Sequence, residues 1–274
     1  MLRSGVMTGF ILRIIAMVTM IIDHVGFSLV GNPMIMRCIG RIAFPVYAFL
    51  LADGFLHFCK NKDRVMKHLT TLIILIFVSE FFVDTLEFGL EFSEYFESQN
   101  VMVTLLLGFL GMLITEKILP NGDENSKVDV RSVFVLISSY LLLGFANLMM
   151  NSNFNLVGPM LVIAFYWFLR ISRNPKTNEN NWKWWKRFSF LLLIFVVYLP
   201  IYFWVRTDFG SFNDWIQILK DYFPWIIGHV LAVLILSFYN GKLGYSKPWF
   251  RKLYLIMYPL NAAVIGLLHI LLGL

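Results

Sequence analysis

Three ionisable residues near the start of the chain stand inside long apolar stretches, where a lipid environment penalises them. Asp23 and His24 are adjacent within the stretch 10–30, and Arg41 lies near the start of the stretch 39–58. A charged or titratable group inside a membrane-spanning helix is costly unless it faces a protein interior or a water-filled cavity. These three residues therefore indicate a functional site.

The residue types suggest acyl transfer with proton movement. Histidine is the side chain best suited to move a proton near neutral pH, and arginine stays charged when buried and can stabilise an oxyanion. Consecutive helical residues point about 100° apart, so Asp23 is poorly placed to orient His24. We expect Asp23 to pair with Arg41 instead, and Glu80 or Asp84 to be the carboxylate that orients His24.

The composition predicts an all-α polytopic membrane protein. Of its 274 residues, 58% are hydrophobic and 15% are charged, whereas globular proteins carry about 25% charged residues. The longest polar segment, 170–187, is too short to fold alone, so we expect a single transmembrane domain over 1–274. The net charge of +6 is explained by loops that face anionic membrane lipid, and no nucleic acid partner is expected.

Nine apolar stretches approach the length of about 20 residues that crosses a bilayer. The predicted transmembrane helices are 10–30, 39–58, 69–88, 100–118, 132–149, 154–169, 188–205, 223–239 and 253–274. Most of the 23 basic residues fall in alternate loops. By the positive-inside rule, the N-terminus is cytoplasmic and the C-terminus is outside, in a multi-pass protein of the cytoplasmic membrane.

With this orientation, polar residues of several predicted helices share one depth in the outer half of the membrane. Besides the first three, they are Glu80, Asp84, Asn100, Thr104 and His229. The shared depth predicts one polar chamber in which these five side chains bind substrate. Structural interpretations stay open: Glu80 and Asp84 could neutralise Arg41, and His229 could be a hydrogen-bonded helix contact.

Metal and disulfide chemistry are not indicated by the sequence. It contains no HExxH motif, cysteine cluster or DxDxDG loop, so no metal site is expected. The two cysteines, Cys38 and Cys59, flank one predicted helix. They would lie about 30 Å apart along it, which excludes a disulfide between them.

Several motifs together resemble the TraX family, named for the acetylase that modifies the N-terminus of F-type conjugative pilin. They are MIIDHVG at 20–26, RCIGRIAFPVYAF at 37–49, GFLH at 54–57, QNVMVTLLLG at 99–108, YNGK at 239–242 and YPL at 258–260. The resemblance spans almost the whole chain in order. One departure is Asn261, which follows YPL where the family is expected to place a histidine; others are the run 81–84 and Asn155.

The resemblance implies a membrane acyltransferase that moves an acetyl group from cytoplasmic acetyl-CoA to an extracytoplasmic acceptor. His24 would be the catalytic histidine and Arg41 its charged partner, with Asp23, Gln99, Asn100 and Thr104 in the same chamber. We expect the phosphates of acetyl-CoA to meet the basic cytoplasmic loops. The residues expected to bind them are Lys60, Lys62, Arg64, Lys67 and Lys242.

Two questions stay open at the level of sequence. The acceptor could be a pilin or peptide N-terminus, or a hydroxyl of a surface glycan, so N- and O-acetylation are not distinguished. The alternative function is a transporter, in which the same charged chamber is a substrate site near the midplane. A third alternative is a membrane assembly protein whose charges are interhelical pairs.

Overall fold

A computed structural model describes residues 6–88, 99–120, 129–152, 154–173, 184–206 and 212–272, and the structural statements below concern these residues. They form helices and no strand, as the all-α prediction requires. The helices are α1 (Gly9–Ser28), α2 (Met34–Gly40), α3 (Ala43–Phe58), α4 (Lys62–Phe88), α5 (Val101–Ile118), α6 (Val130–Met149), α7 (Val157–Arg173), α8 (Trp184–Arg206), α9 (Phe212–Ser237) and α10 (Pro248–Leu272).

The apolar helices make this a membrane protein. In the described ranges, six helical segments are long and apolar enough to cross a bilayer: Gly9–Ser28, Met34–Phe58, Lys62–Thr85, Val101–Ile118, Val130–Met149 and Pro248–Leu272. The other three predicted spans correspond to shorter apolar helices, Val157–Ser172, Arg187–Tyr198 and Tyr222–Ser237. The count of nine crossings and the cytoplasmic N-terminus stay predictions.

Side chains at the helix starts explain several of the boundaries. Ile11 N–H donates to Thr8 Oγ1 at the start of α1, and Ser132 N–H donates to Asp129 Oδ1 at the start of α6. Asn100 caps α5 by accepting from Met102 N–H at 2.8 Å. Each cap satisfies a backbone donor that the first helical turn leaves open.

The second predicted span differs from the structure in two ways. It begins at Met34 rather than at 39, and it is interrupted at Arg41 and Ile42 between α2 and α3. Pro45 explains the interruption, because proline lacks a backbone donor and its ring clashes with the carbonyl four residues earlier, that of Arg41. Arg41 therefore lies at a break in the helix rather than within a regular turn.

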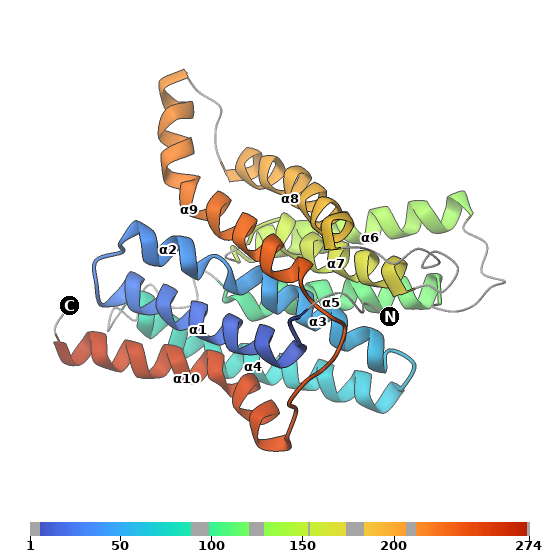
Figure 1. The fold of residues 1–274 in the computed structure, drawn as a ribbon, viewed down its shortest axis with the longest axis horizontal. Coiled ribbons are helices and arrows are strands. Elements are labelled where there is room, and N and C mark those ends of the chain that lie inside the picture. Colours follow the sequence, from blue (N-terminus) through green and yellow to red (C-terminus); the bar gives the residue numbers. More distant parts are fainter. Residues whose placement is uncertain are drawn as a thin grey trace.

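The ninth helix also begins earlier than expected. It starts at Phe212 rather than at 223, and it contains Pro224. Figure 1 shows the orange helix α9 changing direction along its length. A proline inside a helix removes one hydrogen bond and commonly bends the axis.

The first and last helices run side by side in the same direction (Figure 1). Where α1 begins, Gly9 N–H donates to the Lys242 carbonyl at 2.8 Å, just before α10. Where both helices end, His269 Nδ1 lies 2.9 Å from the Ser28 carbonyl oxygen. Parallel first and last helices are what an odd number of crossings requires.

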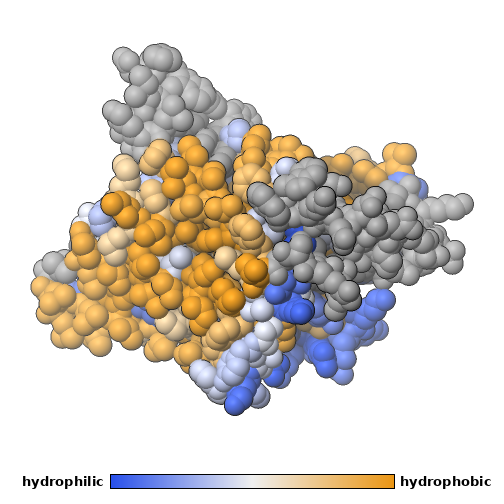
Figure 2. Space-filling model, in the orientation of Figure 1, coloured by the Kyte–Doolittle hydropathy of each residue, from blue (hydrophilic) through white to orange (hydrophobic). Residues whose placement is uncertain are grey.

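The basic residues expected to meet acetyl-CoA lie at one end of the bundle. Asp53, near the end of α3, accepts a hydrogen bond from the hydroxyl of Tyr239, just after α9, at 3.0 Å. This contact brings the loop between α3 and α4 to the same end as the segment before α10. Figure 2 shows a broad apolar face, with most of its hydrophilic atoms gathered toward the end where α4 and α10 begin.

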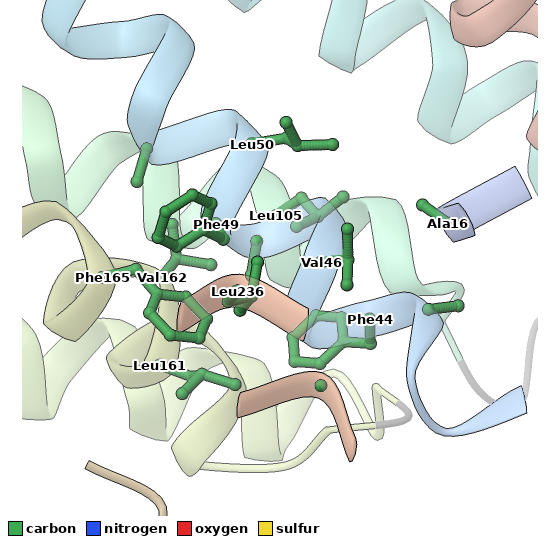
Figure 3. Close-up of a cluster of buried hydrophobic side chains, with 14 of the residues drawn as sticks. Ala16, Phe44, Val46, Phe49, Leu50, Leu105, Leu161, Val162, Phe165 and Leu236 are labelled. Carbon is green, nitrogen blue, oxygen red and sulfur yellow. The ribbon is translucent and has the colours of Figure 1, made fainter. Parts of the chain in front are cut away.

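The hydrophobic core lies where α1, α3, α5, α7 and α9 meet. Figure 3 shows Phe49 of α3, Phe165 and Val162 of α7, and Leu236 of α9 packed together. Helices α5 and α7 approach closely because Gly108 faces Val162, and a Cβ at Gly108 would lie 2.6 Å from the Val162 Cβ. Small residues allow this approach between membrane helices, and the packing fixes the wall that α5 gives to the site.

Candidate active site

A cavity of about 150 Å³ lies among α1, α2, α3, α4, α5 and α10. It collects three of the residues that the sequence singled out, Asp23, His24 and Arg41. Its lining consists of Met20, Asp23, His24, Phe27, Arg37, Gly40, Arg41, Ala43, Phe44, Tyr47, Val83, Val101, Met102, Leu105, Phe154 and Tyr258. The polar groups thus converge on one space with mostly apolar walls, which is the usual form of a small-molecule site.

Helix α2 lies against α1 at Asp23 because Gly40 has no side chain. A Cβ at Gly40 would lie 2.3 Å from the Asp23 Cβ, a distance that real atoms do not adopt. At this crossing, Arg37 Nη1 donates to Asp23 Oδ1 at 2.8 Å. Both side chains are mostly buried, with exposed fractions of 20% for Arg37 and 15% for Asp23.

The prediction that Asp23 pairs with Arg41 was wrong. In the described structure Asp23 pairs with Arg37, which the sequence analysis left in an outer loop. The early start of α2 at Met34 makes Arg37 helical and places it one turn before Arg41. Both arginines therefore reach the cavity, and the site carries one cation more than the sequence predicted.

Arg41 is held against the aromatic ring of Trp225 from α9. The Arg41 guanidinium carbon lies 4.1 Å from the centre of that ring. Gly228, one turn after Trp225, lets α9 approach, because a Cβ there would lie 2.5 Å from the Arg41 Cβ. A cation over a tryptophan face is attracted by the ring quadrupole, so α9 helps to fix the guanidinium at the edge of the cavity.

His24 contacts α10 rather than a carboxylate. Its Nδ1 lies 2.5 Å from Asn261 Nδ2, and its ring meets the Tyr258 ring edge-on at 6.2 Å between centroids. The expectation that Glu80 or Asp84 orients His24 is therefore wrong. Because Nδ1 is occupied by Asn261, Nε2 is the ring nitrogen left for a molecule in the cavity.

Glu80, Asn100 and Thr104 belong to a separate buried network behind the cavity wall. Asn100 donates to Glu80 Oε2 from its backbone N–H, at 3.2 Å, and from its side-chain amide. Thr104 donates to Asn147 Oδ1 at 3.0 Å and lies 2.8 Å from Ser152 Oγ. Their neighbours in sequence on α4 and α5 line the cavity, whereas these side chains do not.

Asp84 and His229 also lie outside the cavity lining. Both are buried, with exposed fractions of 1% and 0%. His229 Nδ1 lies 2.7 Å from the Trp225 carbonyl oxygen, and the His229 and Trp225 rings stack at 5.7 Å. His229 thus contacts Trp225, which packs against Arg41. None of the five residues expected to bind substrate is part of the cavity lining.

These observations describe a membrane protein with a histidine and two arginines around one small cavity. The model of the TraX protein family matches residues 8–269. The chain belongs to the TraX family. The resemblance drawn from the motifs is thereby confirmed.

One relative is an uncharacterized protein of Rickettsia prowazekii (strain Madrid E), 21% identical over 262 residues that cover 95% of this chain and 91% of the relative. A local similarity to efflux pump mlcE of Penicillium citrinum, 39% identical over 62 residues, covers 23% of this chain and 10% of that protein. No solved structure matches this TraX-family chain.

Sequence reasoning missed a line of side chains between the basic end of this TraX-family chain and its cavity. The Arg13 guanidinium lies 5.6 Å from the centre of the Tyr254 ring, and Tyr254 stacks on Tyr47 at 5.3 Å. Tyr47 lines the cavity and reaches Met20 Sδ with its hydroxyl at 3.7 Å. The available signal was Arg13 itself, a charged residue inside the first apolar stretch.

The five basic residues expected to bind the donor are exposed: Lys60, Lys62, Arg64, Lys67 and Lys242. They lie at the end of the bundle where α1 begins. His24 comes fifteen residues after Gly9, the first residue of α1, or roughly 22 Å along the axis at about 1.5 Å per residue. The cavity and the basic end of this TraX-family protein are therefore separated by most of the length of α1.

Proposed function

We propose that this protein is a membrane-bound acetyltransferase that moves an acetyl group from acetyl-CoA to an acceptor on the far side of the cytoplasmic membrane. The observation that carries the proposal is the convergence of His24, Arg41 and the Arg37–Asp23 ion pair on one cavity. A titratable ring beside fixed cations, in mostly apolar walls, suits proton removal with stabilisation of an anionic intermediate. Membership of the TraX family supports the same chemistry.

In the proposed reaction, His24 Nε2 removes the proton of the acceptor hydroxyl or amine. The acceptor atom attacks the carbonyl carbon of the acetyl thioester, and negative charge develops on the carbonyl oxygen. Arg41, held over Trp225, stabilises that charge. The carbon–sulfur bond then breaks, and the proton from His24 passes to the departing thiolate, which leaves as CoA thiol.

Arg37 and Asp23 set the charge around this reaction. Asp23 neutralises Arg37 through their 2.8 Å ion pair. Arg37 also lies 5.3 Å from the centre of the Phe27 ring, so its position is fixed on two sides. The pair thereby holds α1 against α2, keeping His24 and Arg41 on facing walls, and we assign it a positioning role.

The donor enters from the basic end in this proposal. The phosphates of acetyl-CoA meet the exposed lysines and arginine just before and at the start of α4, together with Lys242 before α10, because clustered cations attract phosphate. The thin pantetheine arm then follows the line from Arg13 to Tyr254 and Tyr47. Arg13 and His24 are eleven residues apart on α1, roughly 16 Å at about 1.5 Å per residue, a span that an extended arm covers.

The acceptor is a peptide N-terminus, as in pilin, or a hydroxyl of a surface glycan. Both supply one nucleophilic atom that has to come within hydrogen-bond reach of His24 Nε2. The cavity of about 150 Å³ accommodates the acetyl group and the reacting end of the acceptor rather than a whole polymer. The buried network of Glu80, Asn100 and Thr104 supports the wall behind it.

Acetyl-CoA binding to the purified protein tests the proposal. A ligand at 100 times its dissociation constant adds about 2.7 kcal/mol of stability, so acetyl-CoA should raise the unfolding temperature of the wild type. His24→Ala should keep this shift and lose acetyl transfer. Replacing Lys62 and Arg64 by glutamine should reduce the shift, whereas glutamine at the exposed Lys117 and Arg131 provides a control with the same change in charge.

No shift at millimolar acetyl-CoA would contradict the acetyltransferase and favour the transporter, in which the charged cavity holds a transported solute. Binding with unchanged transfer in His24→Ala would remove His24 from the mechanism. Unchanged cellular function of His24→Ala without donor binding would favour the membrane assembly protein.

A further inference from the structure

The contact between His24 and Asn261 decides which nitrogen of the imidazole ring can work as a base. Residues 24 and 261 come from the first and last helices, and the side chains of His24 and Asn261 meet at 2.5 Å. Asn261 has an exposed fraction of 5%. The last helix departs from the family pattern in sequence at Asn261, and no role was predicted for it. The contact shows that α10 contributes directly to the surroundings of the candidate base.

Two neighbouring contacts hold α10 in register with α1. Tyr258, one turn before Asn261, meets the edge of the His24 ring, and His269, two turns after it, reaches the Ser28 carbonyl. The Asn261 amide is therefore fixed against Nδ1 rather than brought there by a flexible side chain. A buried amide in this position can act on the proton distribution of the ring.

A primary amide can satisfy Nδ1 in two ways. Its carbonyl oxygen accepts a hydrogen bond from Nδ1–H, or its NH₂ group donates one to a bare Nδ1. The structure has Asn261 Nδ2 facing Nδ1, which is the second arrangement. A half-turn of the amide, which leaves its shape unchanged, gives the first. The two arrangements give opposite tautomers: the first leaves the lone pair of Nε2 facing the cavity, and the second puts a proton there.

Building on the proposed acetyl transfer, we propose that Asn261 is a positioning residue that holds His24 as the Nδ1–H tautomer, with the lone pair of Nε2 directed to the acceptor. Only this tautomer can remove the acceptor proton at Nε2. When Nε2 takes that proton, the Asn261 oxygen still accepts from Nδ1–H and supports the charged ring. When Nε2 passes the proton to the CoA thiolate, the ring returns to its starting form.

The other histidines of the chain provide an internal reference. The chain has five histidines, and Nδ1 of each of the other four lies near a backbone carbonyl oxygen: His57 near Asp53, His68 near Arg64, His229 near Trp225 and His269 near Ser28. A carbonyl oxygen accepts only, so Nδ1 carries the proton at these residues. His24 is the histidine whose partner leaves both tautomers possible.

Nitrogen-15 NMR of the full chain in lipid nanodiscs, with labelled histidine, tests the proposal because the two tautomers give different shifts for Nδ1 and Nε2. The His24 signals are assigned by their loss in His24→Ala, and the buried His229 gives the Nδ1–H reference. In the wild type we expect His24 to match His229. In Asn261→Leu the Nδ1–H form should fall to a minor share, and Asn261→Asp, which keeps an oxygen acceptor, should retain it.

A wild-type His24 protonated at Nε2 would overturn the proposal, as would an unchanged His24 tautomer in Asn261→Leu with the His229 signals intact. If Asn261→Leu does not fold, the wild type and Asn261→Asp still decide, because both must show Nδ1–H. The measurement uses neither acetyl-CoA nor an acceptor. A wild-type Nε2–H result would therefore remove proton abstraction by His24 Nε2 while leaving acetyl-CoA binding intact. Absence of acetyl-CoA binding removes the reaction and leaves the tautomer result intact.

Discussion

The central carbon of the Arg41 guanidinium lies 4.1 Å from the centre of the Trp225 ring, at the break between α2 and α3. This contact ties a catalytic candidate near the N-terminus to the ninth helix. Trp225 also meets Phe154 at 5.4 Å between ring centroids, and Phe154 lines the cavity. The orientation of Arg41 therefore depends on a residue that the substrate does not touch.

Removing the tryptophan ring should weaken catalysis without removing a catalytic group. A cation–π contact contributes about 0.5–2 kcal/mol, so Trp225→Leu should lower kcat/KM by roughly 2- to 30-fold. Trp225→Phe keeps an aromatic face and should lose less. Steady-state kinetics of acetyl transfer in the two variants shows which has the lower kcat/KM. An equal decrease of kcat/KM in both would show that Trp225 contributes only its volume.

The close approach at Gly40 should make that position intolerant of any side chain. Gly40→Ala puts a Cβ 2.3 Å from Asp23, and relieving such overlap costs about 1–3 kcal/mol. Gly54→Ala is the matched control, because the nearest atom to its added Cβ is 3.8 Å away and alanine favours a helix over glycine by about 0.8–1 kcal/mol.

Thermal unfolding of both glycine variants measures the difference. We expect a lower midpoint than that of the wild type for Gly40→Ala, and an equal or higher midpoint for Gly54→Ala. Gly40→Ala should also disturb acetyl transfer, because the added methyl group displaces α2 and with it Arg37. A fully active Gly40→Ala protein of wild-type stability would contradict the packing of α2 on α1.

The Asp23–Arg37 pair should show strong energetic coupling. Removing one partner of a buried pair leaves the other charge uncompensated, which costs about 3–5 kcal/mol when burial is complete and less at the partial exposure found here. Asp23→Asn and Arg37→Gln should each destabilise the protein, and the double variant should lose less stability than the sum of the two single losses. A double-mutant cycle in urea or by heat measures the coupling, and additive effects would mean that the pair contributes nothing.

Loss of the His24 ring should remove acetyl transfer while the protein stays folded. General acid–base groups contribute about 10²- to 10⁴-fold in rate. The rate of acetyl transfer by His24→Ala should therefore be lower than that of the wild type by at least about 10²-fold. His269→Gln is the comparison, since glutamine keeps a donor for the Ser28 carbonyl and the residue lies outside the cavity lining. Transfer assays on membranes of matched protein content separate the two variants.

The sequence predicted that Asp23, His24 and Arg41 meet, and they line one cavity. It predicted the direction of side chains around the helix axis poorly, because the face of a helix that a residue occupies depends on packing. Asn100 lies at the start of α5, whose residues Val101 and Met102 line the cavity, yet its side chain turns toward Glu80 and caps α5.

Two partners were beyond the reach of the apolar pattern. Arg37 joined the site because α2 begins before the apolar stretch does, and because Pro45 interrupts the helix at Arg41. Asn261 joined it because α10 lies parallel to α1, a neighbour relation between segments 237 residues apart in sequence. Long-range contacts of this kind are set by the whole bundle rather than by local spacing.

The pairing of α1 with α10 has a consequence for the protein during its synthesis. The candidate base leaves the ribosome 237 residues before the amide that meets it. Until α10 is inserted, the imidazole lacks its neighbour and one wall of the cavity is open to lipid. An unfinished chain therefore carries the histidine without the surroundings that we propose make it a base, so the nascent protein acquires its chemistry only when the bundle closes.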